Sequence, residues 1–98
     1  MFEIHEAFAG QILANLKALD SDWFTKNYLK RQTKIGTIDL NKWNNWGGSL
    51  SIGHPFGATG TRLCITAANR LIKENGKYGI VSACAAGGIG VGMLVERF

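Results

Sequence analysis

Glycine constrains this chain more than any other residue type. Thirteen glycines stand against one proline, and most of the glycines follow Trp46. The segment 47–60 alternates small and apolar residues and ends in a turn with glycines at positions 53, 57 and 60. This pattern predicts a strand that ends before His54, then a tight turn.

A helix is expected to follow this turn, over about residues 58–74. Asn75-Gly76 is a suitable C-terminal stop for it. Its apolar positions predict a face turned to a core, made of Leu63, Ala67, Ala68, Leu71 and Ile72.

The last twenty residues predict two apolar strands, over 79–84 and about 90–96. The residues between them read Ala-Ala-Gly-Gly-Ile. The glycines can adopt the positive φ angles of a tight turn, so a C-terminal β-hairpin is expected.

The first half of the chain predicts mainly helix. Residues 2–4 have the composition of a short strand, and 6–19 carry one apolar helix face, made of Phe8, Ile12, Leu16 and Leu19. Asp20-Ser21-Asp22 is expected to stop that helix and to cap a second one that runs to about Arg31. Residues 32–45 are expected to form a polar excursion.

These elements together predict an α/β fold in one small domain of 98 residues. The helix over 58–76 implies a crossover between two parallel strands, and the terminal hairpin implies an antiparallel edge. We therefore expect a mixed sheet with helices packed on it.

Composition excludes several classes of protein. Apolar residues make up 46% and charged residues 18%, which excludes a disordered tail and a strongly charged nucleic-acid arm. No apolar run approaches the roughly 20 residues of a membrane span. The net charge is +4, which fits either an anionic ligand, such as a phosphorylated cofactor, or one solvated face. Five of the cations fall close together: Lys26, Lys30, Arg31, Lys34 and Lys42.

Two cysteines, Cys64 and Cys84, are too few for a disulfide framework, so a reducing compartment is expected. The spacing of His5, His54 and the cysteines matches no zinc site, so no metal is expected. Cys64 lies among aliphatic residues of the predicted helix and is expected to be a core residue.

His54 is the strongest chemical candidate. Glycines at 53, 57 and 60 let a ligand approach the backbone, and the next helix directs its N-terminus to the same place. A histidine there can serve as a base or an oxyanion donor, although a capping histidine in a structural turn is the alternative. The turn lacks the lysine of a phosphate-binding P-loop.

Cys84 and His5 are the other candidates. The turn after Cys84 can direct backbone amides at whatever the sulfur faces, as in a thiol beside an oxyanion hole. The alternative is a buried cysteine before a hairpin. His5 stands at a helix start, where it could be a cap or a catalytic group.

Three motifs, in this order, resemble the C-terminal part of thiolases: HEAFAGQ, GGSLSIGHPFGATGTR and CAAGGIGVGMLVER. Thiolases cleave a 3-ketoacyl-CoA with coenzyme A or run the reverse condensation. The resemblance is nearest to the branch of the trifunctional-complex β-subunit. His5 stands where most thiolases carry Asn, and Cys84-Ala-Ala-Gly-Gly replaces the commoner Cys-x-Gly-Gly-Gly.

The resemblance implies roles for single residues. His54 would activate the nucleophilic cysteine and bind the thioester oxygen, and His5 would help to bind that oxygen through a water. Cys84 would be the general acid and base, and the amide of Ala86, supported by Gly87 and Gly88, would form a second oxyanion hole. Coenzyme A would be a substrate, and no cofactor is implied.

The resemblance also implies a missing part. A thiolase has two similar halves, and its nucleophilic cysteine lies in the first. Residues 1–98 are therefore expected to be a C-terminal domain truncated at its N-terminal side, inactive alone and completed by the first half or by self-association. An acyl-CoA-binding or thiolase-interaction module is the alternative, and a truncated reading frame without function is a third.

Partners and the cellular compartment are constrained only weakly by the sequence. No nucleic-acid partner is expected. Residues 23–31 could touch a membrane surface or a partner subunit, or could be an ordinary amphipathic helix packed on the domain. The mitochondrial matrix and a bacterial cytoplasm both fit.

Overall fold

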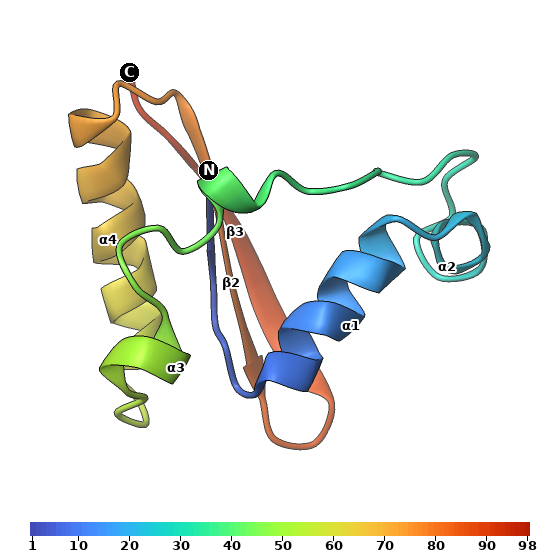
Figure 1. Ribbon diagram of the computed structural model, residues 1–98, viewed down its shortest axis with the longest axis horizontal. Coiled ribbons are helices and arrows are strands. Elements are labelled where there is room, and N and C mark those ends of the chain that lie inside the picture. Colours follow the sequence, from blue (N-terminus) through green and yellow to red (C-terminus); the bar gives the residue numbers. More distant parts are fainter.

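A three-stranded mixed sheet forms the centre of the protein, whose computed structural model describes all residues from 1 to 98. The strands are β1 (Phe2–Ile4), β2 (Tyr78–Ala85) and β3 (Ile89–Glu96), in that spatial order (Figure 1). β1 runs parallel to β2, and β2 runs antiparallel to β3. The α/β fold with a mixed sheet and a C-terminal hairpin is confirmed.

Helices lie on both sides of this sheet. α4 (Thr59–Lys73) packs against β1 and β2, and α1 (Ala9–Leu19) lies on the opposite side (Figure 1). Three shorter helices complete the fold: α2 (Asp22–Asn27), the 3-10 helix η1 (Leu40–Lys42) and α3 (Ser49–Ile52). None of the helices is long and apolar enough to cross a membrane.

The core between α4 and the sheet is small. Leu63 and Ala67 pack against Val81, and Leu71 is also buried. The prediction that Ala68 and Ile72 face this core is wrong, because both are exposed. The narrow sheet under α4 covers only one stripe of the helix, and the neighbouring stripe remains in solvent.

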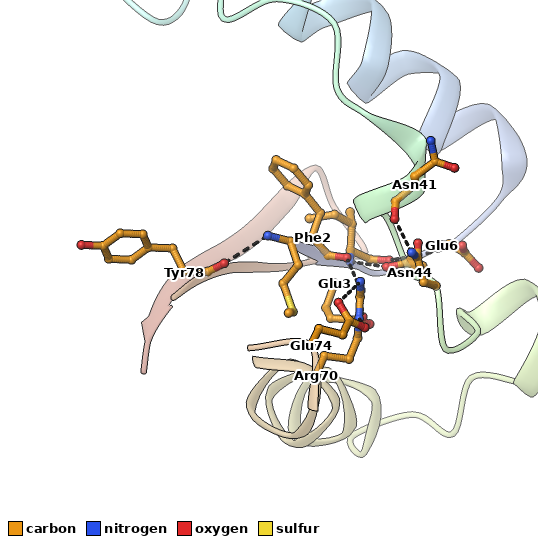
Figure 2. Close-up of polar contacts among 11 residues, drawn as sticks. Phe2, Glu3, Glu6, Asn41, Asn44, Arg70, Glu74 and Tyr78 are labelled. Atoms are coloured by element: carbon orange, nitrogen blue, oxygen red, sulfur yellow. Dashed lines mark hydrogen bonds and ion pairs between the residues drawn. The ribbon is translucent and has the colours of Figure 1, made fainter. Parts of the chain in front are cut away.

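A buried ion pair joins the same two layers. The Arg70 guanidinium contacts the Glu3 carboxylate at 2.5 Å, and both side chains are almost fully buried. Arg70 also pairs with Glu74, at 2.9 Å (Figure 2). Since a buried charge is stable only when it is paired, these carboxylates allow Arg70 to lie within the apolar stripe of α4.

The strand expected before His54 is wrong, since residues 49–52 form the helix α3. The amide of Leu50 donates to the Glu6 carboxylate at 3.0 Å, and the amide of Ile52 donates to the carbonyl of Gly48. The carboxylate satisfies a free N–H of the first turn, which favours a helix over a strand. The parallel neighbour of β2 is consequently β1, and not the segment before His54.

Two helix boundaries also differ from the prediction. α1 begins at Ala9 rather than at residue 6, and Phe8 is exposed instead of lying on its apolar face. α2 ends at Asn27 rather than near Arg31, and Lys30 adopts a left-handed conformation with φ 55°. The predicted capping of α2 by Ser21 is confirmed, because its hydroxyl accepts from the amide of Phe24.

Candidate functional site

The two histidines of the chain lie against each other. Their ring centroids are 4.2 Å apart, with 37° between the ring planes. His5 follows β1, and its amide donates to the carbonyl of Ser82 on β2 at 2.8 Å. His54 lies in the turn between α3 and α4. The fold thus joins two of the predicted site residues that are far apart in the sequence.

Each imidazole is held through Nδ1 by a hydroxyl group. Nδ1 of His5 lies 2.9 Å from Oγ of Ser49, and Nδ1 of His54 lies 2.6 Å from Oγ1 of Thr59. Ser49 and Thr59 are both buried. Nε2 of each ring is therefore the nitrogen that remains for a bound group.

The turn around His54 is built as the glycine pattern predicts, with one exception. Gly53 and Gly57 have φ angles of 93° and 79°, which favour glycine. The Arg62 side chain donates to the carbonyl of Gly53 at 2.8 Å and ties the turn to α4. Gly60 lies inside α4 without a positive φ, so its role in the turn is not a conformational one.

Cys84 shares a cavity with His5. The cavity has a volume of about 210 Å³, and its walls come from β1, α1, β2 and β3. The Cys84 side chain is exposed, so the alternative of a buried structural cysteine is wrong. Because the His54 ring lies against the His5 ring, Cys84 and both histidines belong to one region of the molecule.

The turn after Cys84 has the predicted backbone. Residues 86–88 connect β2 to β3, and Gly87 and Gly88 have φ angles of 87° and 75°. The hairpin pairs Cys84 with Gly90, so Cys84 lies one residue pair from the end of the ladder. Ala86 lies in this exposed turn, two residues after the thiol.

The electrostatics favour a neutral His5. Burial lowers the pKa of His5 below its ordinary value, and the neighbouring His54 and Arg62 act in the same direction. The Glu6 carboxylate opposes this effect.

Glu6 has a structural position beside the site. Its carboxylate accepts from the amide of Leu50 and from Nδ2 of Asn44 (Figure 2). Nδ2 of Asn44 also donates to the carbonyl of Ile4, and Oδ1 of Asn44 accepts from the amide of Ile4. A Cβ atom on Gly48 would overlap this carboxylate. The residues before and after His5 are therefore fixed to the loop that carries Asn44.

Sequence reasoning did not identify Ser49 and Thr59, whose hydroxyls contact the two histidine rings, or Arg62, which donates to Ser49 and Gly53. No local sequence pattern marks them, because only the fold brings Ser49 and Thr59 to the rings and Arg62 to Ser49. Cys64, in contrast, is half-buried against the core cluster, as predicted. No group of three or more His, Cys, Asp or Glu side chains is arranged to hold a metal ion.

Comparisons with known proteins agree on one family. The family model described as "Thiolase, C-terminal domain" matches residues 1–97. The human protein named "Trifunctional enzyme subunit beta, mitochondrial" is 68% identical over 97 residues, which cover 99% of this chain and 20% of that protein. The "3-ketoacyl-CoA thiolase" of Shewanella woodyi is 51% identical over 98% of this chain and 22% of its own length.

Solved structures show the same similarity. Human mitochondrial 3-ketoacyl-CoA thiolase superposes with a TM-score of 0.79 at 32% identity, over 100% of this chain and 20% of that one. Acetyl-CoA acetyltransferase from Bacillus anthracis gives a TM-score of 0.72 at 33% identity, over 98% of this chain and 20% of that one. The chain thus spans about a fifth of the length of these relatives.

Proposed function

The chain belongs to the thiolase family through its C-terminal domain, and from this premise we propose that it supplies acid–base and oxyanion-binding groups for acyl transfer between a 3-ketoacyl-CoA and coenzyme A. The observation that carries the proposal is the convergence of His5, His54 and Cys84. These residues come from three separate parts of the sequence. His5 and Cys84 border one cavity, and the His54 ring lies against the His5 ring.

Cys84 is the proposed general acid and base. When the bond between C2 and C3 of the substrate breaks, its thiol protonates the α-carbon of the leaving enolate. When coenzyme A attacks the acyl-enzyme, the Cys84 thiolate accepts the proton of the attacking thiol. Its exposed position beside the cavity supports this role.

His54 is the proposed donor to the thioester oxygen and also activates the nucleophile, and His5 is proposed to bind the same oxygen through a water. A donor aimed at an oxygen that gains negative charge stabilises the transition state more than the ground state. The amide of Ala86 is the proposed donor of a second oxyanion hole. The left-handed glycines that follow it give the turn the curvature that this position requires.

The nucleophilic cysteine of the family is proposed to come from outside these 98 residues, on the same polypeptide or on a partner chain. The exposed apolar residues of β3 support such a contact, because strands of this kind are normally covered. They are Ile89, Val91, Met93 and Leu94. The names of several relatives include "mitochondrial", which supports a mitochondrial location over a cytoplasmic one.

A chimeric enzyme tests the proposal. This chain replaces the matching segment of the human trifunctional enzyme β-subunit, and thiolysis of a long-chain 3-ketoacyl-CoA is measured. We expect an active chimera, and we expect Cys84→Ala or His54→Ala to lower kcat by about 100-fold or more. His5→Asn should retain activity, since an amide N–H also donates, whereas His5→Ala should lose it.

Cys64→Ala is the matched control, because this second cysteine packs against the core and lies outside the site. It should keep thiolysis near that of the unmodified chimera. A folded but inactive chimera would contradict the proposal. Equal activities of the Cys84→Ala and Cys64→Ala variants would contradict the role of Cys84.

A further inference from the structure

Ser49 lies between an arginine and a histidine in the buried part of the site. Its Oγ is 2.9 Å from Nδ1 of His5, and Nη2 of Arg62 donates to the same Oγ at 3.0 Å. The Ser49 side chain is buried, and the other arm of Arg62 is held by the carbonyl of Gly53. The hydroxyl therefore has two fixed neighbours and little access to water.

The number of donors and acceptors around Ser49 indicates whether the proton between Oγ and Nδ1 of His5 belongs to the hydroxyl or to the ring. A serine hydroxyl has one proton and two lone pairs. If Nδ1 of His5 donated to Ser49, Oγ would accept two bonds and its own proton would have no acceptor in the chain. If Ser49 donates to Nδ1, every group is satisfied. A buried polar hydrogen without a partner has lost its hydrogen bond to water and gained none in return, so the second arrangement is favoured.

The charge of Arg62 favours the same arrangement. A guanidinium that donates to Oγ draws electron density from the hydroxyl, which makes the O–H a stronger donor and Oγ a weaker acceptor. The imidazole that accepts this bond carries its proton on Nε2. His5 also borders the cavity that contains Cys84, and Nε2 is its ring nitrogen without a hydrogen-bond partner in the chain.

We infer that Ser49, held by Arg62, is a positioning residue that keeps His5 in the Nε2–H tautomer and makes His5 a hydrogen-bond donor toward the substrate oxygen, rather than a base. The tautomer itself follows from the contacts of Ser49, and only its use in acyl transfer rests on the proposed function. The two histidines then have different tasks, since the activation of a nucleophile is left to His54.

Nitrogen NMR of the ¹⁵N-labelled chain tests the tautomer without any activity. The chain has only two histidines, and the signals lost in His5→Asn identify those of His5. At a pH where the ring is neutral, we expect the correlations of a ring protonated on Nε2 and unprotonated on Nδ1. A ring protonated on Nδ1 would overturn the inference, and this first measurement needs no variant of Ser49.

Variants of Ser49 test its part in the effect. Ser49→Ala should shift the two ring-nitrogen signals of His5 toward each other, because both tautomers become populated, and Ser49→Thr should restore the original spectrum. Ser51→Ala is the matched control on the same helix, since its hydroxyl donates to the carbonyl of Gly48 and not to a histidine. Identical spectra for Ser49→Ala and Ser51→Ala would contradict the role of Ser49.

Kinetics of the chimera then separate the two proposals. Ser49→Ala should lower kcat by about five- to tenfold, the effect of one ordinary hydrogen bond, with KM within about twofold of the unmodified value. Ser49→Thr should recover most of this loss. If NMR finds the Nε2–H tautomer but His5→Ala leaves thiolysis unchanged, the role of His5 in acyl transfer is wrong while the positioning by Ser49 stands.

Discussion

Glu3 and Arg70 form an ion pair at 2.5 Å in which both side chains are only 1% exposed, and this pair connects β1 to α4. Oε2 of the Glu3 carboxylate has no hydrogen-bond partner, so the carboxylate is stabilised through Oε1, which accepts from Arg70. β1 leads directly into His5, while α4 carries Arg62 and begins with Thr59. The pair therefore links the two elements that hold the two histidines.

Glu3→Gln should destabilise the chain strongly. The isosteric amide keeps the shape of the side chain but leaves Arg70 without its buried counter-charge, and breaking such a pair costs about 3–5 kcal/mol. Glu74→Gln is the control, because Glu74 is 38% exposed and its pair with Arg70 is worth about 1 kcal/mol or less. Urea unfolding measures the free energy of unfolding of both variants. Equal losses in Glu3→Gln and Glu74→Gln would show that the burial of the ion pair does not determine its contribution to stability.

His5 should make stability depend on pH. Burial, together with His54 and Arg62, holds the pKa of His5 below the ordinary value of 6.5, while the Glu6 carboxylate acts to raise it. The unfolded chain therefore takes up a proton below about pH 6.5 that the folded chain does not, and stability falls as the pH falls. Urea unfolding between pH 7.5 and pH 5.5 should show a larger loss for the unmodified chain than for His5→Asn. A loss of the same size in both chains would exclude His5 as the cause.

Structure that depends on neighbouring residues was predictable from the sequence. The helix over 58–74, the hairpin and the cap at Ser21 all follow from apolar spacing, glycine positions and capping residues within a few positions. The α/β class followed from the same signals.

Structure that depends on distant residues was not predictable. Residues 49–52 form a helix because Glu6, far away in the sequence, accepts from the amide of Leu50. Arg70 lies in the apolar stripe of α4 because Glu3 neutralises it, and no local pattern shows such a partner. The sequence predicts both histidines and Cys84 as site residues. Ser49 and Thr59 could not be predicted, because only the fold brings their hydroxyls to the rings.

Gly48→Ala and Gly10→Ala should have opposite effects. A Cβ at Gly48 would collide with the Glu6 carboxylate and displace it from Leu50 and Asn44, so we expect a loss of about 1–3 kcal/mol. A Cβ at Gly10 meets nothing within 4 Å and lies inside α1, where alanine should stabilise by about 0.5–1 kcal/mol. Thermal unfolding compares them, and a neutral Gly48→Ala would show that the carboxylate moves without cost.

The turn that presents the Ala86 amide should be sensitive to its glycines. Gly88→Ala forces an L-residue to adopt a φ of 75° and should cost about 1–2 kcal/mol, although space around the position is free. Gly60→Ala serves as the comparison, because it also meets nothing within 4 Å but lies in α4 without a positive φ. The Gly60→Ala variant should be neutral or slightly stabilising, as measured by thermal unfolding.

The same two variants test the amide of Ala86 in the chimera. Because the strain at Gly88 would move this amide, the chimera that carries Gly88→Ala should also lose thiolysis, while the one with Gly60→Ala should keep it. A Gly88→Ala chimera that is destabilised yet fully active would separate the turn conformation from acyl transfer and would remove Ala86 from the proposed site.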